Sequence, residues 1–84
     1  MPRFYFHVVS EGDIYLDFEG MILTDAVAAR GYALEHARDL LRAFSGRIDE
    51  PAAWRIEVAD GEGIPLLFVL LSEVAAEVGH SPPN

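Results

Sequence analysis

His7, Asp17 and Glu57 are the side chains in this sequence that together could bind a divalent metal or move a proton. One histidine with two carboxylates is a minimal set for either task. His7 lies in a predicted strand, with its side chain opposite Phe4 and Phe6, and both carboxylates could share its face. No metal-binding spacing such as H-E-x-x-H accompanies them. We therefore expect a structural or interface role for His7, and keep the three residues as candidates for a metal or acid–base site.

Other catalytic chemistry lacks the residues that it needs. The chain has no cysteine, and Ser10, Ser45 and Ser72 stand at expected turns or caps rather than in a G-x-S-x-G elbow. The acidic run Asp60–Gly63 is too short for a calcium loop, and the glycines form neither a G-x-G-x-x-G motif nor a P-loop. We therefore predict no catalytic residue and no cofactor, and we expect a protein that is not an enzyme.

The charge balance argues against two classes of partner. The 84 residues carry 14 acidic and 6 basic side chains, for a formal net charge of −8. Nucleic-acid affinity comes mostly from Lys and Arg side chains that neutralise phosphates, and anionic membranes likewise attract basic segments. Because acidic residues outnumber basic ones here, we expect neither nucleic acid nor a membrane as a partner.

The longest apolar stretch, Ile64–Leu71, is far shorter than the roughly 20 residues that span a bilayer. With no cysteine to oxidise, a cytoplasmic location is the expectation.

The first half of the chain predicts a hairpin and a long helix. Residues 4–9 are aromatic and β-branched, residues 10–13 form a tight turn, and residues 14–18 alternate apolar and polar side chains. Thr24-Asp25 caps a helix that continues to Phe44. One stripe of this helix is apolar at spacings of three and four, and it contains Ala29, Ala33, Ala37, Leu40, Leu41 and Phe44.

The second half predicts another hairpin and a short helical segment. Trp54–Val58 alternates apolar and charged residues, Asp60–Gly63 forms the turn, and Ile64–Leu71 is apolar on both faces. Ser72 caps a last short helical segment. We predict one α+β domain over residues 1–78, with the order ββαββ, a four-stranded sheet, one long helix on one face, and a disordered tail over residues 79–84.

One helix cannot cover both faces of such a sheet. Soluble monomers rarely leave a large apolar patch exposed, and a symmetric dimer is the commonest way to cover one. If the helix covers the even-numbered residues of the strands, the uncovered face holds odd-numbered residues, among them His7, Val9, Arg55 and Glu57. We predict a homodimer, or a second protein in the same place, with an interface of Leu67, Val69, Leu71, Tyr5 and Tyr15. Alternatively, residues 72–78 fold back over the apolar strip within one chain.

Three segments, taken together, point to a known family. They are Met1–Val8 (MPRFYFHV), the helix opening Asp25–Arg30, and Trp54–Val58 (WRIEV) followed by Asp60 and Gly63. This set resembles a family of small bacterial domains of unknown function, over nearly the whole chain. The resemblance implies a compact α+β domain, and because the family has no assigned activity it implies nothing about catalysis. The arrangement is also similar, more loosely, to small antitoxins with a double-stranded-RNA-binding-like fold.

Three hypotheses about function result. The leading one is a non-catalytic, homodimeric protein-interaction module whose acidic exterior keeps it soluble and away from nucleic acid. The first alternative is a small metal-dependent or acid–base enzyme that uses His7 with Asp17, Glu57 or both. The second alternative is an antitoxin-like regulator, which predicts a neighbouring toxin gene.

Overall fold

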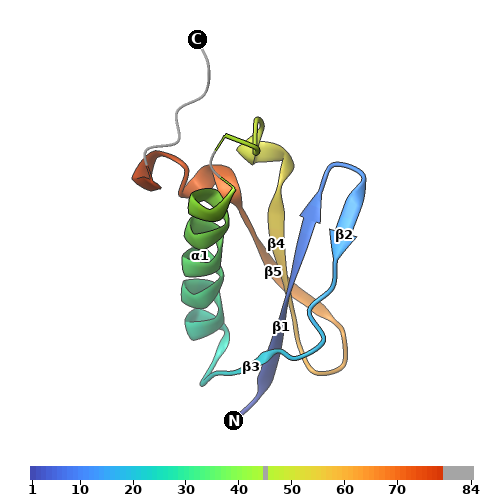
Figure 1. Ribbon diagram of the computed structural model, residues 1–84. Coiled ribbons are helices and arrows are strands. Elements are labelled where there is room, and N and C mark those ends of the chain that lie inside the picture. Colours follow the sequence, from blue (N-terminus) through green and yellow to red (C-terminus); the bar gives the residue numbers. More distant parts are fainter. Residues whose placement is uncertain (45, 79–84) are drawn as a thin grey trace.

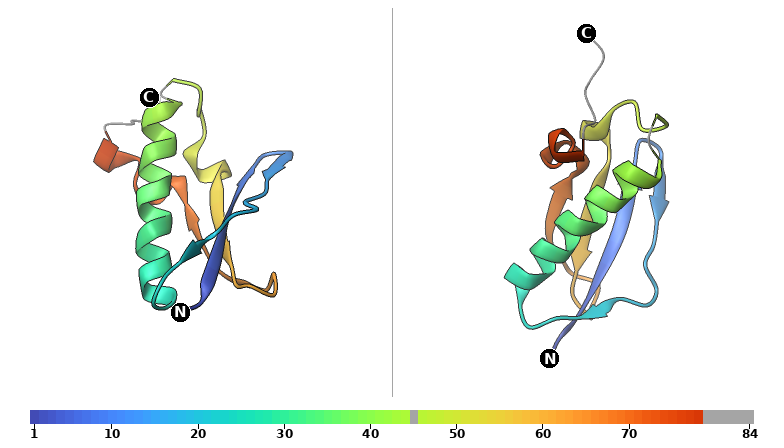
Figure 2. Two further views of the ribbon diagram at one scale, coloured as in Figure 1. Left: turned by 60° about the horizontal axis from the view of Figure 1, so that its bottom comes forward. Right: turned by 60° about the vertical axis from the view of Figure 1, so that its left-hand side comes forward.

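In the computed structural model, which describes residues 1–44 and 46–78, one helix crosses one face of an antiparallel sheet (Figure 1, Figure 2). The strands are β1 (Arg3–Ser10), β2 (Asp13–Tyr15), β3 (Met21–Ile22), β4 (Arg55–Ala59) and β5 (Pro65–Leu70), and the long helix is α1 (Ala26–Ala43). Three short 3-10 helices are η1 (Pro51–Ala53), η2 (Leu71–Glu73) and η3 (Ala76–Val78).

The predicted α+β class and long helix are confirmed, with five strands in place of four. The C-terminal helical segment is present as two short 3-10 helices, but the predicted cap at Ser72 is wrong, because Ser72 lies within the first of them. The strand order is β2-β1-β4-β5, and β3 pairs with the other end of β1. The extra strand is β3, a two-residue segment just before α1. A strand this short leaves no alternation pattern in the sequence. The tail predicted over residues 79–84 lies outside the described residues.

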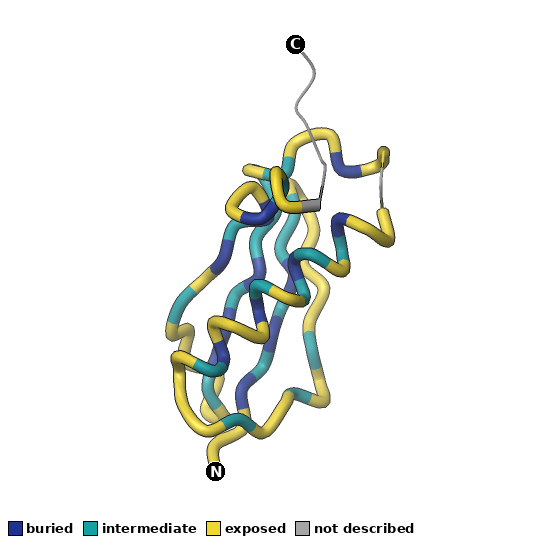
Figure 3. Tube along the Cα trace, turned by 90° about the vertical axis from the view of Figure 1, so that its left-hand side faces the viewer, coloured by how far each residue is buried: buried dark blue, intermediate teal, exposed yellow. Residues whose placement is uncertain are grey.

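β1 and β4 form the centre of the sheet and bury alternate side chains beneath α1. On β1 these are Phe4, Phe6 and Val8, and on β4 they are Ile56 and Val58. The register places Val8 opposite Ile56 and Phe6 opposite Val58, so the partners share a face. Figure 3 shows the buried residues gathered where α1 lies over the strands. The core therefore lies on one side of the sheet.

Helix α1 begins at the predicted cap and lies close to the sheet. The Asp25 carboxylate accepts a hydrogen bond from the backbone N–H of Ala28 at 2.9 Å, which satisfies one free donor of the first turn. Ala29, Ala33 and Ala37 are fully buried, because their small side chains face the strands at helical spacing. The cap and the alanine stripe are confirmed. Neither α1 nor any other helix within residues 1–44 and 46–78 is long and apolar enough to cross a membrane.

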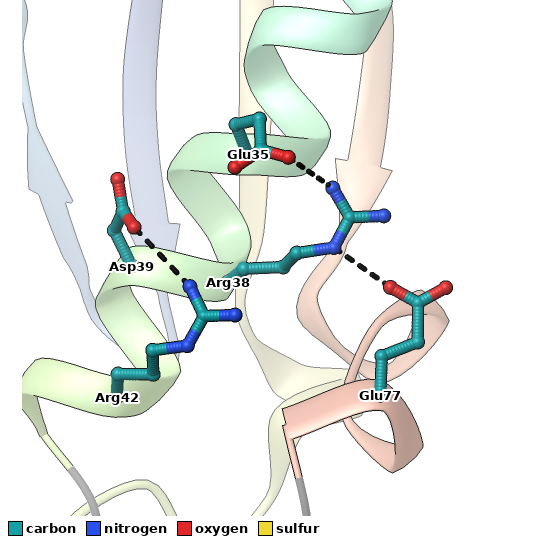
Figure 4. A network of polar contacts seen from close by, with 5 residues as sticks. All are labelled: Glu35, Arg38, Asp39, Arg42 and Glu77. Carbon is teal, nitrogen blue, oxygen red and sulfur yellow. Dashed lines mark hydrogen bonds and ion pairs between the residues drawn. The ribbon is translucent and has the colours of Figure 1, made fainter.

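The C-terminal segment packs beside α1. Arg38 donates from Nε to Glu77 at 2.7 Å and from Nη1 to Glu35 at 2.9 Å (Figure 4). The hydrogen bond to Glu77 raises the pKa of Arg38, and the charges of both carboxylates add to this effect although burial opposes it. Val74, between η2 and η3, is buried in the core. Residues 72–78 therefore lie on the helix side and leave the opposite face of the sheet uncovered.

The faces of β5 are the reverse of the prediction. Val69 and Leu71 are fully buried, and Leu67 packs half-buried against the core. Leu66 and Phe68 point the other way and are 45% and 60% exposed. The prediction that Leu67, Val69 and Leu71 form the uncovered strip is therefore wrong, and Leu66 and Phe68 occupy that face instead.

The hairpin between β4 and β5 explains this reversal. The Asp60 carboxylate accepts hydrogen bonds from the N–H groups of Glu62 and Ile64 at 2.8 and 3.0 Å, which closes the predicted turn. Beside it, the pairing shifts register between Val58 and Ala59. A one-residue shift moves every following side chain to the other face. Because β5 is apolar on both faces, no alternation in its sequence reveals the shift.

The second strand is shorter than predicted. β2 ends at Tyr15, and the side chains of Ile14, Leu16 and Phe18 are all exposed. Tyr15 lies opposite Val8 and therefore on the helix side, so its predicted place on the uncovered face is wrong. The two-residue turn between β1 and β2 sets this register.

We expect Ala33→Leu to lower the free energy of unfolding by about 1–3 kcal/mol, because the larger side chain would push α1 away from the strands. Gly31→Ala is the control on the same helix, since a Cβ there meets nothing within 4 Å. It should stabilise the protein by up to about 1 kcal/mol. Urea unfolding of both variants measures the difference, and a parent-like Ala33→Leu would contradict the close approach of α1.

Candidate functional site

The uncovered side of the sheet is the surface on which most of the candidate residues gather. We call it the open face, and the strand registers place on it Tyr5, His7 and Val9 from β1, Ile14 from β2, Arg55 and Glu57 from β4, and Leu66, Phe68 and Leu70 from β5. Ile14, Leu66 and Phe68 are exposed, and the others are half-buried. The open face is therefore mainly apolar and aromatic.

Two rows of side chains cross the middle of the open face. His7 lies opposite Glu57, and Glu57 lies opposite Phe68. The neighbouring row contains Val9, Arg55 and Leu70. A shallow hollow of about 720 Å³ lies over β4 and β5, and the side chains of both charged residues line it. One acid and one base thus stand side by side among apolar neighbours.

His7 is fixed by two contacts of its ring. Its Nδ1 accepts a hydrogen bond from the backbone N–H of Asp17 at 3.0 Å, so the neutral imidazole carries its proton on Nε2. The ring of Tyr5 stacks on the imidazole with a centroid distance of 6.5 Å and an interplanar angle of 11°. These contacts fix the orientation of the His7 ring beside the chain that leaves β2, which is a structural role.

Asp17 uses its carboxylate to hold the chain where it leaves β2. Oδ2 accepts from the N–H of Phe6 at 3.1 Å, and Oδ1 accepts from the N–H groups of Glu19 and Gly20 at 3.0 Å each. The backbone N–H of Asp17 in turn donates to the imidazole of His7. In this segment, side chains therefore take the place of the backbone acceptors that a strand partner would supply. The second strand ends early because this local network satisfies the backbone in place of the sheet ladder.

The same network shifts the acidity of Asp17. Burial acts to raise the pKa of the carboxyl, but the hydrogen bonds from the backbone N–H groups of Gly20, Phe6 and Glu19 outweigh it. The pKa of Asp17 therefore lies below its ordinary value of 3.8. A carboxylate with a lowered pKa is a poor proton donor or acceptor near neutral pH.

The structure thus brings the three predicted candidates together and gives two of them structural partners. His7 faces Glu57 across two strands, and it binds the backbone of Asp17. Within residues 1–44 and 46–78, no group of three histidine, aspartate or glutamate side chains is placed to hold a metal ion. Glu57 keeps a carboxylate that points to the open face.

A second hollow lies on the helix side of the sheet, between α1 and the segment that leaves β2. Its volume is about 400 Å³, and its lining includes Tyr15, Leu16, Met21, Tyr32 and His36. The ring of Tyr32 packs on that of Phe6 with a centroid distance of 4.7 Å and an interplanar angle of 55°. Tyr15 belongs to this hollow rather than to the open face.

Gly20 lets the crossing chain pass close to β1. Its φ is +71°, and a Cβ at this position would lie 2.7 Å from the carbonyl oxygen of Phe4. This position therefore requires glycine for two reasons: its backbone is left-handed, and there is no room for a side chain. Gly12, in the turn between β1 and β2, has a φ of +87° but open space around it.

Sequence reasoning missed three exposed residues of the open face, Ile14, Leu66 and Phe68. A signal for the first was present, because a two-residue turn at Glu11-Gly12 sets Ile14 opposite Val9. No such signal exists for the other two, since the register shift in the second hairpin decides their face.

Fold and site together define a small α+β domain in which one helix covers one face of an antiparallel sheet and leaves the other face open. The chain belongs to the family described as Domain of unknown function (DUF6894), which matches residues 3–72. The match begins at the first residue of β1 and ends within η2, so it includes all five strands and α1. No curated protein matches the chain, and no solved structure does.

Replacing Asp17 by asparagine should destabilise the protein by about 1–3 kcal/mol at pH 7, because three N–H donors lose a charged acceptor. The lowered pKa makes this contribution pH-dependent. It is fully present above the unfolded-state pKa and disappears as the pH falls through the folded-state pKa. Urea unfolding should therefore show a smaller difference between this variant and the parent at pH 3 than at pH 7. Glu11→Gln, in the exposed turn nearby, is the control, and a pH-independent difference for Asp17→Asn would contradict the network.

The glycines allow a matched comparison. Gly12→Ala and Gly20→Ala should each lower the free energy of unfolding by about 1–2 kcal/mol, because alanine is strained in the left-handed backbone conformation. Gly20→Ala should cost a further 1–3 kcal/mol or so, because the methyl group meets the backbone of β1. The free energies of unfolding of the two variants, measured side by side, test the close approach. Equal values would show that the crossing chain does not lie against β1.

Proposed function

We propose that this protein is a non-catalytic interaction module that works as a homodimer through its open face. The observation that carries the proposal is the exposure of Ile14, Leu66 and Phe68, at 65%, 45% and 60%, on a sheet surface that no helix of the described chain covers. Apolar patches of this kind on soluble proteins mark interaction surfaces. A second copy is the commonest partner that fits such a surface.

The distribution of charge supports self-association at this face. The chain has 14 acidic residues, yet Glu57 is the one acid among the side chains that define the open face, and Arg55 balances it. Two copies can therefore approach at this face without bringing acidic clusters together. Elsewhere on the molecule, the net charge of −8 opposes such an approach.

The edge strand β5 is less suited to pairing than the open face. β5 begins with Pro65, which has no N–H to donate. At its other end, the N–H of Leu70 already donates to the Glu73 carboxylate at 2.9 Å. Proteins protect edge strands from pairing with devices of this kind. These contacts favour packing of two sheets face to face over the addition of a strand at β5.

The enzyme alternative receives less support from the same residues. A catalytic role would need the Asp17 carboxylate, which already accepts hydrogen bonds from three backbone N–H groups. It would also need the His7 ring, whose Nδ1 already accepts from the backbone of Asp17. Glu57 faces a histidine whose ring the backbone of Asp17 already orients, and this pair without a further group is a weak basis for catalysis.

The variant Phe68→Asp should weaken self-association by about 2 kcal/mol or more, which is roughly 30-fold in Kd, because it replaces an exposed aromatic side chain of the interface with a charge. Val27→Asp is the matched control, since Val27 is 81% exposed but lies on α1, on the other side of the sheet. Sedimentation velocity over a range of concentrations measures both variants against the parent.

Circular dichroism and urea unfolding establish that each variant is folded. A parent that dimerises while Phe68→Asp keeps the parent's Kd would show that the interface lies elsewhere. A parent that is monomeric at every concentration, or that dimerises only with a different protein, would refute homodimerisation.

A further inference from the structure

Two opposite charges in the middle of the open face restrict what can cover it. Arg55 and Glu57 are two residues apart on β4, so both side chains point to this face. Both are half-buried, and the ion pairs within residues 1–44 and 46–78 use other side chains. A protein packed over them would remove their remaining water, and a buried charge without a partner is strongly destabilising. A partner that brings an acid to Arg55 and a base to Glu57 avoids this cost.

A second copy of this chain carries the required charges, and of the two symmetric orientations with aligned strands one presents them correctly. In a symmetric dimer, contact of one residue with a second implies the reciprocal contact. A two-fold axis parallel to β4 would set Arg55 against the partner's Arg55, which is repulsive. An axis that runs across the strands and passes over Ile56 exchanges the two positions. It sets Arg55 against the partner's Glu57, and Glu57 against the partner's Arg55.

We propose that the homodimer has this antiparallel arrangement, with two open faces packed together and two reciprocal ion pairs between Arg55 and Glu57. This inference rests on the proposed function and deepens it. The same axis sets Phe68 over the partner's Leu70 and His7 over the partner's Val9, because these residues flank the two charges in the sheet register. Each aromatic ring then meets an aliphatic side chain. Packed sheets with nearly aligned strands are a common arrangement.

Charge reversal tests this orientation. Arg55→Glu gives a chain with two acids at these positions, and Glu57→Arg gives a chain with two bases. Each variant alone should self-associate at least about 100-fold more weakly than the parent, because like charges meet twice. An equimolar mixture of the two should form a heterodimer, since every acid then meets a base. The chain with both substitutions should dimerise as the parent does.

Sedimentation equilibrium of the four proteins and the mixture provides the masses, and circular dichroism provides the control for folding. Recovery of the dimer in the mixture and in the doubly substituted chain is the expected result. A parent that dimerises while the single variants also dimerise, or while the mixture stays monomeric, would overturn the antiparallel orientation and leave the proposed homodimer standing. A monomeric parent would overturn both.

Discussion

The structure depends on one geometric constraint, which is that a single helix can cover only one face of a sheet. Helix α1 lies close to the strands because Ala29, Ala33 and Ala37 place only methyl groups between them. Strand alternation then sends every second side chain of β1, β4 and β5 to a face without cover. The open face is thus a direct consequence of how the core is built.

Residues that could perform chemistry are used here to shape the backbone. Asp17 and His7 meet where the chain leaves β2 and crosses toward β3, and their side chains take over hydrogen bonds that a longer strand would have made. The lowered pKa of Asp17 has the same origin, since the three donors that hold the chain also stabilise the charged carboxylate. A histidine and an acid in contact are therefore explained by local structure.

Much of the fold could be predicted from the sequence, because local chemistry marks it. The Asp25 cap, the alanine spacing and the alternation around Ile56 are all visible in the residues themselves. The faces of β5 could not be predicted, since a register shift beside Val58 decides them and an apolar strand shows no pattern. The early end of β2 also escaped prediction, because contacts between residues ten positions apart cause it.

The central claim is that a second copy of the chain binds the open face. Isotope-filtered NMR on a mixture of labelled and unlabelled chains tests it most directly, because it detects only contacts between chains. The account predicts contacts from the ring protons of Phe68 to the methyl groups of the partner's Leu70. Contacts between chains that involve only residues of α1, or no contacts at any concentration, would contradict it.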